Sequence, residues 1–466
     1  MKFVYYGHNY IYAVEQMAAS LFPVTEDTSE STLVTRLSRG GAYTTATCLY
    51  NGSFRGRASV KNESVNDSTA QAAIKTAIYR AVRRSGKTRP PWGALSGVRP
   101  GKLMAGLMDI KEFQRRFDVT PERARLCYET SLHTLAARDS LSAKDICLYV
   151  GIPFCPTRCA YCSFVSQSVE KSLKLIAPFL EALFKELEAI ARQVQNCGLK
   201  VVSIYFGGGT PTTLSAQQLD SLCSFIESRF DLSSLREFCV EAGRPDTIDA
   251  AKLEALKKHG VNRLSVNPQS MSDSVLKAIG RRHSADDVIR AFSLVKSAGG
   301  FDINADLIAG LPSDSPESFR RSIDTVLSLA PENITVHTLS LKRGSGLLLG
   351  GYPLPNAAET AAMLDYAYSA LRSSGFEPYY LYRQKNMSGG FENTGWTLPG
   401  HENLYNICMM EELCTILAAG GGGSSKLILP GNGKNLRITT PKYPLEYIQQ
   451  IDKTCADKER IGNFYV

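Results

Sequence analysis

The stretch that decides the fold is GIPFCPTRCAYCSF, residues 151–164. It places three cysteines, Cys155, Cys159 and Cys162, in a C-x3-C-x2-C pattern and supplies no fourth. Structural zinc sites close a tetrahedron with four ligands, and a four-iron cluster normally takes four thiolates. Three thiolates in one short loop therefore indicate a metal centre that keeps one position open for chemistry. Two alternatives stay open on spacing alone: a zinc site completed by a distant ligand, and three unrelated buried cysteines.

The chain around this loop has the composition of a globular protein. Its 466 residues exceed one ordinary core, so two or three domains are expected. Hydrophobic residues make up 44% and charged residues 21%. The amino terminus lacks an apolar segment of signal-peptide length, and no later stretch is long enough to cross a bilayer. We therefore expect a cytoplasmic protein without membrane partners, whose twelve cysteines are reduced thiols.

From residue 147 onward, short apolar runs alternate with amphipathic segments. The predicted strands are residues 147–153, 201–206, 237–242, 262–267, 303–308 and 333–339. The predicted helices are residues 173–194, 219–230, 285–299 and 316–330. Strands that alternate with helices indicate a parallel sheet. Six such units with right-handed crossovers predict an α/β fold, a partial (β/α)6 barrel two units short of a complete one.

The barrel is expected to have a domain on either side. We predict an N-terminal α/β domain over residues 1–140, the barrel over 141–345, and a C-terminal α+β extension over 346–466 that covers the substrate. Residues 68–108 carry basic side chains and no acidic ones. This basic segment is either a solvent-exposed face or a surface that contacts carboxylates. GGGGSSK at 420–426 lacks the residue order of a phosphate-binding loop, which argues against nucleotide hydrolysis.

Polar residues and glycines follow the predicted strands at their carboxyl ends, where barrels of this kind carry chemistry. The cysteine loop follows the first strand, and GGGTPT (207–212) follows the second. Glu241, Gln269 and Asp306 lie at or near the ends of the next three. Glycines allow close approach to a ligand, and carboxylates accept hydrogen bonds from hydroxyls. A structural ion pair is the alternative for each acid, and His337, at the end of the sixth strand, is expected to be structural.

The cysteine loop, followed by GGGTPT, resembles the radical S-adenosylmethionine (SAM) enzymes. A wider set of segments is similar to the oxygen-independent coproporphyrinogen III oxidase family, and the regions outside the barrel resemble its Bacillus-type branch. The segments are YVGIPFCPTRCAYCSF, YFGGGTPTTL, VEAGRPDTI, GVNRLSVNPQS, IGRRHS and DLIAGLPSDSPESF. The resemblance implies a 4Fe-4S cluster on Cys155, Cys159 and Cys162, with S-adenosyl-L-methionine at the open iron. It also implies that the matching positions contact this cofactor: Tyr149, Tyr161, Gly208, Gly209, Thr210, Glu241, Gln269, Arg281 and Asp306.

The resemblance further implies a reaction, the oxidative decarboxylation of coproporphyrinogen III to protoporphyrinogen IX in anaerobic heme biosynthesis. The partners in this reaction would be a tetrapyrrole substrate and an outside electron donor and acceptor. The resemblance identifies no catalytic residue. Three alternatives stay open: a heme-binding chaperone of the same family, a radical methyltransferase acting on heme, and an RNA-modifying radical enzyme. Phe164, where founding members of the family have a further cysteine, also occurs in relatives that resemble the chaperones. The modest net charge of +8 and the lack of a recognisable RNA-binding module make nucleic acid the least favoured partner.

Overall fold

The computed structural model describes residues 1–22, 27–162, 167–340, 353–384, 388–429 and 435–465. The chain forms two compact units. Unit 1 comprises Met1–Ser131, Asn356–Ala361 and Leu381–Asn393, and unit 2 comprises Leu132–Pro355, Ala362–Tyr380 and Thr394–Val466. The predicted three-domain division stays a prediction, and its boundary at residue 345 lies outside the described residues. Within the described ranges, no helix combines the length and the apolar character that crossing a membrane requires.

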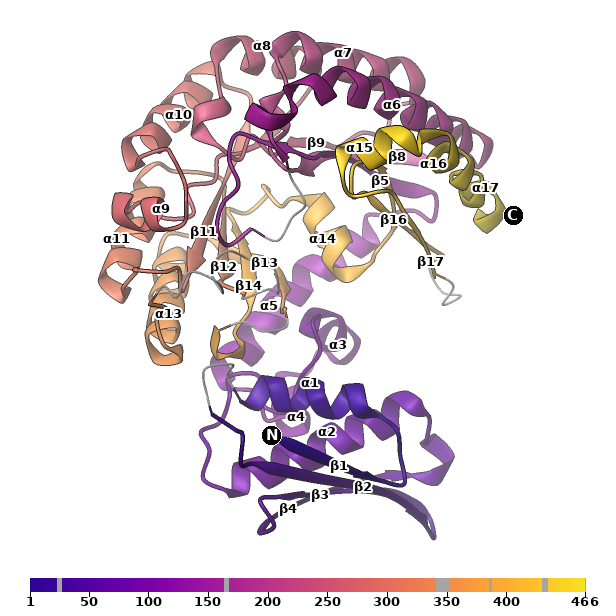
Figure 1. The fold of residues 1–466 in the computed structure, drawn as a ribbon, viewed down its shortest axis with the longest axis vertical. Helices are drawn as coiled ribbons and strands as arrows, with labels where there is room; N and C mark the ends of the chain where they lie inside the picture. Colours follow the sequence, from indigo (N-terminus) through magenta and orange to yellow (C-terminus); the bar gives the residue numbers. More distant parts are fainter. Residues whose placement is uncertain (23–26, 163–166, 341–352, 385–387, 430–434, 466) are drawn as a thin grey trace. The chain divides into compact units, whose positions relative to one another are not determined.

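Unit 1 is built on a four-stranded sheet with the order β1-β2-β3-β4. The strands are β1 (Lys2–Tyr6), β2 (Thr32–Gly40), β3 (Tyr43–Tyr50) and β4 (Phe54–Lys61). Helices α1 (Ile11–Leu21) and α2 (Asp67–Arg84) lie over one face of the sheet (Figure 1). Every second residue of β3 is buried, from Thr44 to Tyr50, because alternate side chains of a strand point to the same face.

The basic segment 68–108 belongs to unit 1. It covers most of α2, the following loop and α3 (Pro100–Leu107). Arg80 and Arg84 donate to the backbone carbonyls of Arg57 and Arg55 on β4, at 2.7 and 2.6 Å. Part of the positive charge of this segment is therefore used to hold α2 against the sheet. Two further helices follow, α4 (Ile110–Phe117) and α5 (Pro121–Asp139), and the second half of α5 belongs to unit 2.

Unit 2 contains the predicted partial barrel. Its six central strands are β5 (Asp145–Ile152), β8 (Lys200–Gly208), β9 (Glu237–Val240), β10 (Arg263–Ser265), β11 (Asp302–Ala309) and β12 (Asn333–Thr338). They pair in this order and all run parallel. These are the six strands that the apolar runs predicted, so this prediction is confirmed. The sheet curves without closing, and the predicted fold class is confirmed as well (Figure 1).

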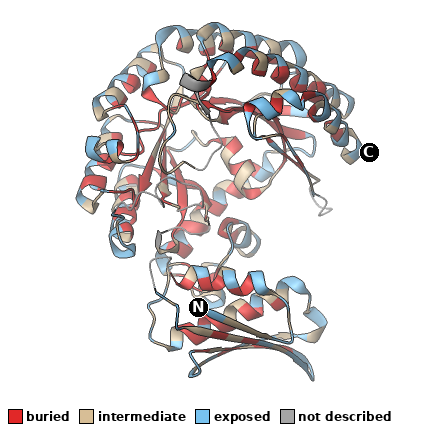
Figure 2. Cartoon of the chain, in the orientation of Figure 1, coloured by how far each residue is buried: buried red, intermediate tan, exposed pale blue. Residues whose placement is uncertain are grey.

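Helices cover the outer face of this sheet (Figure 1). They are α6 (Val169–Asn196), α7 (Ala216–Arg229), α8 (Ala250–Lys258), α9 (Asp273–Ala278), α10 (Ala285–Ala298) and α11 (Pro316–Ser328). Ser215 and Ser284 start α7 and α10 with reciprocal capping hydrogen bonds to the third helical residue. The helices bury their sheet-facing sides and expose the opposite sides, as amphipathic helices do (Figure 2). Sequence analysis predicted four of these helices and missed α8 and α9.

The C-terminal segment extends the same sheet at both ends. Beyond β12 lie β14 (Asn393–Thr397), antiparallel to it, and β13 (Glu377–Tyr382). Beyond β5 lie β15 (Thr415–Gly420), parallel to it, and then β16 (Ser424–Ile428) and β17 (Asn435–Thr439). Helix α14 (Leu404–Glu411) lies inside the curve of the sheet, opposite the outer helices (Figure 1). The remaining helices are α13 (Ala357–Ser373), α15 (Pro444–Gln449), α16 (Ile451–Asp457) and α17 (Glu459–Tyr465).

Candidate functional site

The predicted cluster loop continues directly from β5. Phe154 and Cys155 form a two-residue strand, β6, which pairs with β7 (Gln167–Ser168). The N–H of Cys162 donates to the carbonyl of Cys159 at 3.1 Å, and the N–H of Ala160 donates to the carbonyl of Ile279 at 3.0 Å. Ala160 and Tyr161 also pack against an apolar cluster around α9. Hydrogen bonds and apolar contacts thus position the loop that carries the three predicted ligands.

Two polar side chains approach the cysteines of this loop. Thr210 Oγ1 lies 3.6 Å from the sulfur of Cys155. Nη1 of Arg244 lies 3.9 Å from the sulfur of Cys159 and donates to Thr157 at 3.0 Å. The guanidinium is buried, so a positive charge lies beside the sulfur of this predicted ligand. Arg244, within VEAGRPDTI, was not predicted as a site residue, because nothing in the local sequence distinguishes a buried arginine from an exposed one.

The glycines after β8 pack directly against the cluster loop. The N–H of Gly209 donates to the carbonyl of Ile152 at 2.8 Å, and that of Thr210 donates to the carbonyl of Phe154 at 2.7 Å. A Cβ at position 209 would lie 2.4 Å from the Phe154 carbonyl oxygen, which no ordinary contact permits. Gly208 has a φ of +103°, a conformation that side chains disfavour. Both positions that the resemblance selected therefore require glycine for the loop to lie where it does.

Three stacked tyrosines line the inside of the barrel beneath these glycines. Tyr149 and Tyr205 are partners in register on β5 and β8, with ring centroids 6.2 Å apart. Tyr405 of α14 stacks on Tyr205 at 4.3 Å. A Cβ at Gly207 would lie 2.9 Å from the Tyr205 ring and 3.3 Å from the Glu241 carboxyl carbon. The absence of a side chain at position 207 thus keeps a space between these groups, which suits close approach of a ligand.

Glu241 lies at the end of β9 and accepts a hydrogen bond from the Tyr205 hydroxyl at 2.5 Å. Burial raises the pKa of its carboxyl group to about 7, and the negative charge of Asp306 adds to this effect. Tyr205 and Tyr405 were not predicted. Only the position of Tyr205, two residues before the glycines, hinted at its role. Tyr405 comes from a helix that the sequence pattern does not connect with the barrel.

Gln269 and Asp306 are held together by the backbone. The N–H of Gln269 donates to the carbonyl of Asp306 at 2.8 Å, and Gln269 has a left-handed φ of +67°. Its side-chain oxygen Oε1 is buried and has no hydrogen-bond partner among the described residues. Since buried polar atoms are rarely left without a partner, this oxygen suits a bound ligand.

The Asp306 carboxylate has partners of its own. Asn304 donates to Oδ1 at 2.8 Å, and Nε2 of His337 lies 3.7 Å from Oδ2. Burial alone would raise the pKa of this carboxyl group, but hydrogen bonds and charge from His337, with Asn304, lower it overall. Asp306 therefore keeps a negative charge inside the barrel, close to Glu241.

Arg281 joins the cluster loop to the loop after β10. Its Nη1 donates to the carbonyl of Asn267 at 2.8 Å, and its Nη2 donates to the Tyr161 hydroxyl at 3.2 Å. Nε is buried and finds no hydrogen-bond partner within the described part of the chain. Burial opposes the charge of this guanidinium, yet the neighbouring Tyr161 and Cys159 raise its pKa above the usual value.

The predicted residues thus gather at the carboxyl ends of β5, β8, β9, β10 and β11, and they suit the predicted cofactors. A single metal ion needs its ligands close together, whereas each thiolate of a four-iron cube binds a different iron. Among the described residues, the cysteine sulfurs that all lie within 4.8 Å of one another belong to Cys147, Cys408 and Cys414, not to the predicted loop. Three thiolates on one loop are a donor set that fits a cube with one iron left open. The contact of each individual residue with cofactor stays a prediction.

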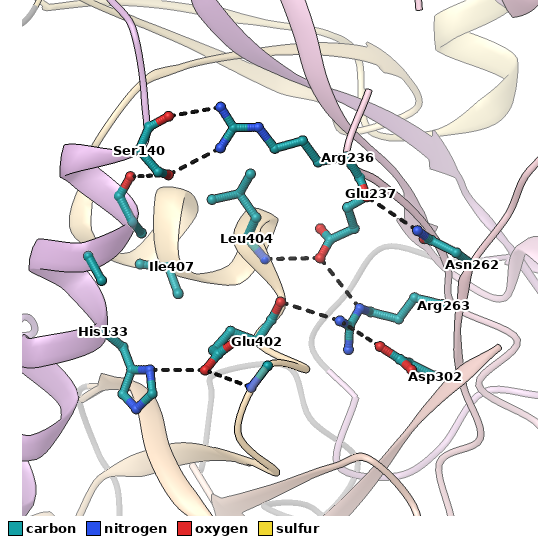
Figure 3. A pocket seen from close by; sticks show the side chains of 13 residues that line it. His133, Ser140, Arg236, Glu237, Asn262, Arg263, Asp302, Glu402, Leu404 and Ile407 are labelled. Atoms are coloured by element: carbon teal, nitrogen blue, oxygen red, sulfur yellow. Dashed lines mark hydrogen bonds and ion pairs between the residues drawn. The ribbon is translucent and has the colours of Figure 1, made fainter. Parts of the chain in front are cut away.

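A polar cavity of about 490 Å³ lies at the opposite, amino-terminal ends of the strands (Figure 3). Arg263 lies between Glu237 and Asp302, at 3.4 and 3.1 Å, and Glu402 pairs with His133 at 3.4 Å. Hydrogen bonding with His133 holds the pKa of Glu402 well below its usual range. Glu237 also accepts the backbone N–H groups of Leu404 and Tyr405, which fixes the start of α14. These pairs join α5, α14 and the sheet, and none of the predicted cofactor residues lines the cavity.

Comparison with known proteins first identifies the superfamily to which the central part of the chain belongs. Residues 149–326 match the radical SAM superfamily. The chain is 39% identical to the oxygen-independent coproporphyrinogen-III oxidase-like protein HemZ of Bacillus subtilis, over 79% of this chain and 76% of that protein. It is 34% identical to the heme chaperone HemW of the same organism, over 53% of this chain and 66% of the chaperone. The structure of coproporphyrinogen III oxidase (HemN) from Escherichia coli superposes with a TM-score of 0.55 at 23% identity, covering 70% of this chain and 73% of that one, which supports the same fold.

Within the radical SAM superfamily, the chain belongs to the oxygen-independent coproporphyrinogen-III oxidase-like family, which HemW also resembles. The predicted family is therefore confirmed. Radical SAM proteins hold a 4Fe-4S cluster and S-adenosylmethionine, so the cofactor prediction is confirmed at the level of the superfamily.

Proposed function

We propose that the protein catalyses the oxidative decarboxylation of coproporphyrinogen III to protoporphyrinogen IX, in the cytoplasm. The observation that carries this proposal is the extent of the similarity to the oxidase-like relative. It covers 79% of the chain and so includes regions outside the matched residues 149–326. A cytoplasmic location agrees with thiolate ligands, which need a reducing compartment.

In this proposal Cys155, Cys159 and Cys162 hold the cluster. When bound, the cluster, reduced by one electron from an outside donor, and S-adenosylmethionine would supply a carbon-centred radical able to remove one hydrogen atom from the β-carbon of a propionate side chain. The carboxylate then leaves as carbon dioxide, a vinyl double bond forms, and one electron passes to an outside acceptor. Two propionates react in turn, which gives two vinyl groups.

The other side chains of the site bind and orient the cofactor. Gln269 Oε1 and Arg281 Nε each offer one unused hydrogen-bonding position, as acceptor and donor respectively. The ionised carboxylate of Asp306 balances the positive sulfonium. Glu241, with a pKa of about 7, can accept or donate a hydrogen bond to a hydroxyl near neutral pH.

The stacked tyrosines and α14 protect the radical. Tyr205 and Tyr405 are buried and occupy the inside of the barrel, which excludes water from the space next to Glu241.

Anaerobic turnover tests the proposal. The reconstituted protein is supplied with a reductant, S-adenosylmethionine, coproporphyrinogen III and an electron acceptor, and the products are followed by mass spectrometry. We expect two losses of carbon dioxide per tetrapyrrole and a matching amount of 5′-deoxyadenosine. Cys159→Ala should abolish both products. Cys197→Ala, which changes a partly exposed cysteine beyond the end of α6, should leave both unchanged.

Cleavage of S-adenosylmethionine without any change in the porphyrinogen would contradict the proposal. Because the chain also resembles a heme chaperone, heme binding is measured in parallel. Stable heme binding by a protein that does not turn over porphyrinogen would assign it the chaperone function instead.

A further inference from the structure

A second group of three cysteines lies away from the cluster loop. Cys147 is on β5, Cys408 is on α14, and Cys414 directly precedes β15. Their sulfur atoms all lie within 4.8 Å of one another, and those of Cys147 and Cys414 are 3.7 Å apart. All three side chains are buried. No local sequence pattern groups these three residues, because they come from distant parts of the chain.

The local structure explains why the three meet. Cys147 pairs in register with Ile416, so Cys414, two residues before Ile416, lies on the same face of the sheet. Helix α14 ends at Glu411, and the left-handed backbone of the next residue, Glu412 (φ +58°), turns the chain back. The N–H of Glu412 donates to the carbonyl of Cys408 at 2.9 Å, and that of Leu413 donates to the same carbonyl at 3.4 Å. This turn returns Cys414 to the side of Cys408.

Buried cysteines often act only as small apolar residues. Here, however, three sulfurs from three segments face one another. Metal–sulfur bonds of about 2.3 Å at tetrahedral angles place thiolate sulfurs about 3.8 Å apart. The distance of 3.7 Å between Cys147 and Cys414 matches that value. It is far longer than a disulfide bond of about 2.05 Å.

We propose that Cys147, Cys408 and Cys414 bind one thiophilic metal ion, Zn²⁺ or Cu⁺, at a site separate from the iron–sulfur cluster. On binding, the thiols lose their protons to solvent and form metal–sulfur bonds, and no electron is transferred. Soft thiolate ligands select ions of this kind. The ion would join β5, α14 and β15. It would thereby fix the helix that places Tyr405 in the barrel, whatever reaction the barrel carries out.

Metal content tests the site without measuring activity. The cluster ligands are first removed from the full-length chain by Cys155→Ala, Cys159→Ala and Cys162→Ala, so that no metal is counted there. This background protein is loaded anaerobically with Zn²⁺ or with Cu⁺, passed over a desalting column, and analysed by elemental mass spectrometry. We expect about one equivalent of the preferred ion per chain, and the two loadings identify which ion that is.

Two matched serine variants then locate the ion. Cys408→Ser should reduce metal retention at least tenfold, whereas Cys223→Ser, at a buried cysteine of α7 outside both groups, should leave it unchanged. The ion should also raise the melting temperature of the background protein and of Cys223→Ser, because it binds the folded state. Cys414→Ser gives the same test if Cys408→Ser does not fold.

Three results would overturn the inference. The first is a background protein that retains neither ion. The second is retention by Cys408→Ser and Cys414→Ser equal to that of Cys223→Ser. The third is an intact mass lower by two hydrogen atoms, with a peptide linking Cys147 to Cys414, which would identify a disulfide pair instead of a metal site.

Discussion

Replacing Gly209 by alanine is expected to displace the cluster loop. The added Cβ would lie 2.4 Å from the Phe154 carbonyl oxygen and 2.8 Å from its carbonyl carbon and nitrogen. Ordinary contact begins at 3.4 Å, so the backbone at Phe154 must move by about 1 Å. Because Cys155 is the next residue, the first predicted ligand moves as well.

The cost follows from overpacking and from lost hydrogen bonds. Overpacking a tight site costs roughly 1–3 kcal/mol, and weakening the bonds from Gly209 to Ile152 and from Thr210 to Phe154 adds about 1 kcal/mol. We expect Gly209→Ala to lower the free energy of unfolding by about 2–4 kcal/mol and to reduce the iron content after reconstitution.

The assay is thermal unfolding under anaerobic conditions together with iron analysis of the same samples. Gly106→Ala is the matched control, because a Cβ at this position of α3 meets nothing within 4 Å. It should be neutral or slightly stabilising, since alanine favours helix. If Gly209→Ala bound as much iron and melted at the same temperature as Gly106→Ala, the packing of β8 against the cluster loop would be refuted.

Three further predictions concern other residues of the site. The raised pKa of Glu241 means that the folded state disfavours its charge. The stability of the wild type relative to Glu241→Gln should therefore fall from pH 4.5 to about pH 7 and then level off. Thermal unfolding of both proteins across this pH range tests the prediction, and a rise in relative stability would contradict it. Arg244→Ala removes the cation beside Cys159 and should speed the loss of iron to a chelator several-fold, while Arg290→Ala, at an exposed arginine of α10, should leave that rate unchanged. Tyr405→Ala should cost about 3–5 kcal/mol of unfolding free energy, whereas Tyr405→Phe should be neutral or stabilising, because its buried hydroxyl has no hydrogen-bond partner among the described residues. Denaturant unfolding of both variants tests this, and equal losses would be inconsistent with it.

The sequence predicted the barrel because buried parallel strands have a distinct local pattern. Each of the six central strands is an apolar run, since both of its faces are covered. The predicted lengths were too long for β9 and β10, which end at Val240 and Ser265 and continue as loops that carry Glu241 and Gln269. In both segments the strand-like sequence pattern continues past the last residue of the strand into the loop that follows.

The flanking strands were not assigned because their pairing is not local. β15 pairs with β5, which lies about 270 residues earlier in the chain. β14 pairs antiparallel with β12, at the other end of the six central strands. No pattern within either segment specifies these neighbours. GGGGSSK runs from the last residue of β15 through the turn at residues 421–423 into β16.

The candidate site shows the same contrast. The predicted cluster ligands and the predicted glycines at the end of β8 could be recognised from the sequence, because each group lies within one short segment. Arg244 and Tyr405 carried none, because their roles depend on burial and on neighbours from other strands and helices. The grouping of Cys147 with Cys408 and Cys414 likewise exists only in the folded chain.

The pairing of β15 with β5 has a consequence for synthesis on the ribosome. Strand β5 leads into the cluster loop, yet one of its edges stays without its partner until Thr415–Gly420, about 270 residues further along the chain, has emerged. Until then the nascent barrel presents an open strand edge, the kind of surface on which chains aggregate. A stop codon between Asp306 and β15 would therefore yield a chain that contains every predicted cofactor ligand and still depends on chaperones to remain dispersed.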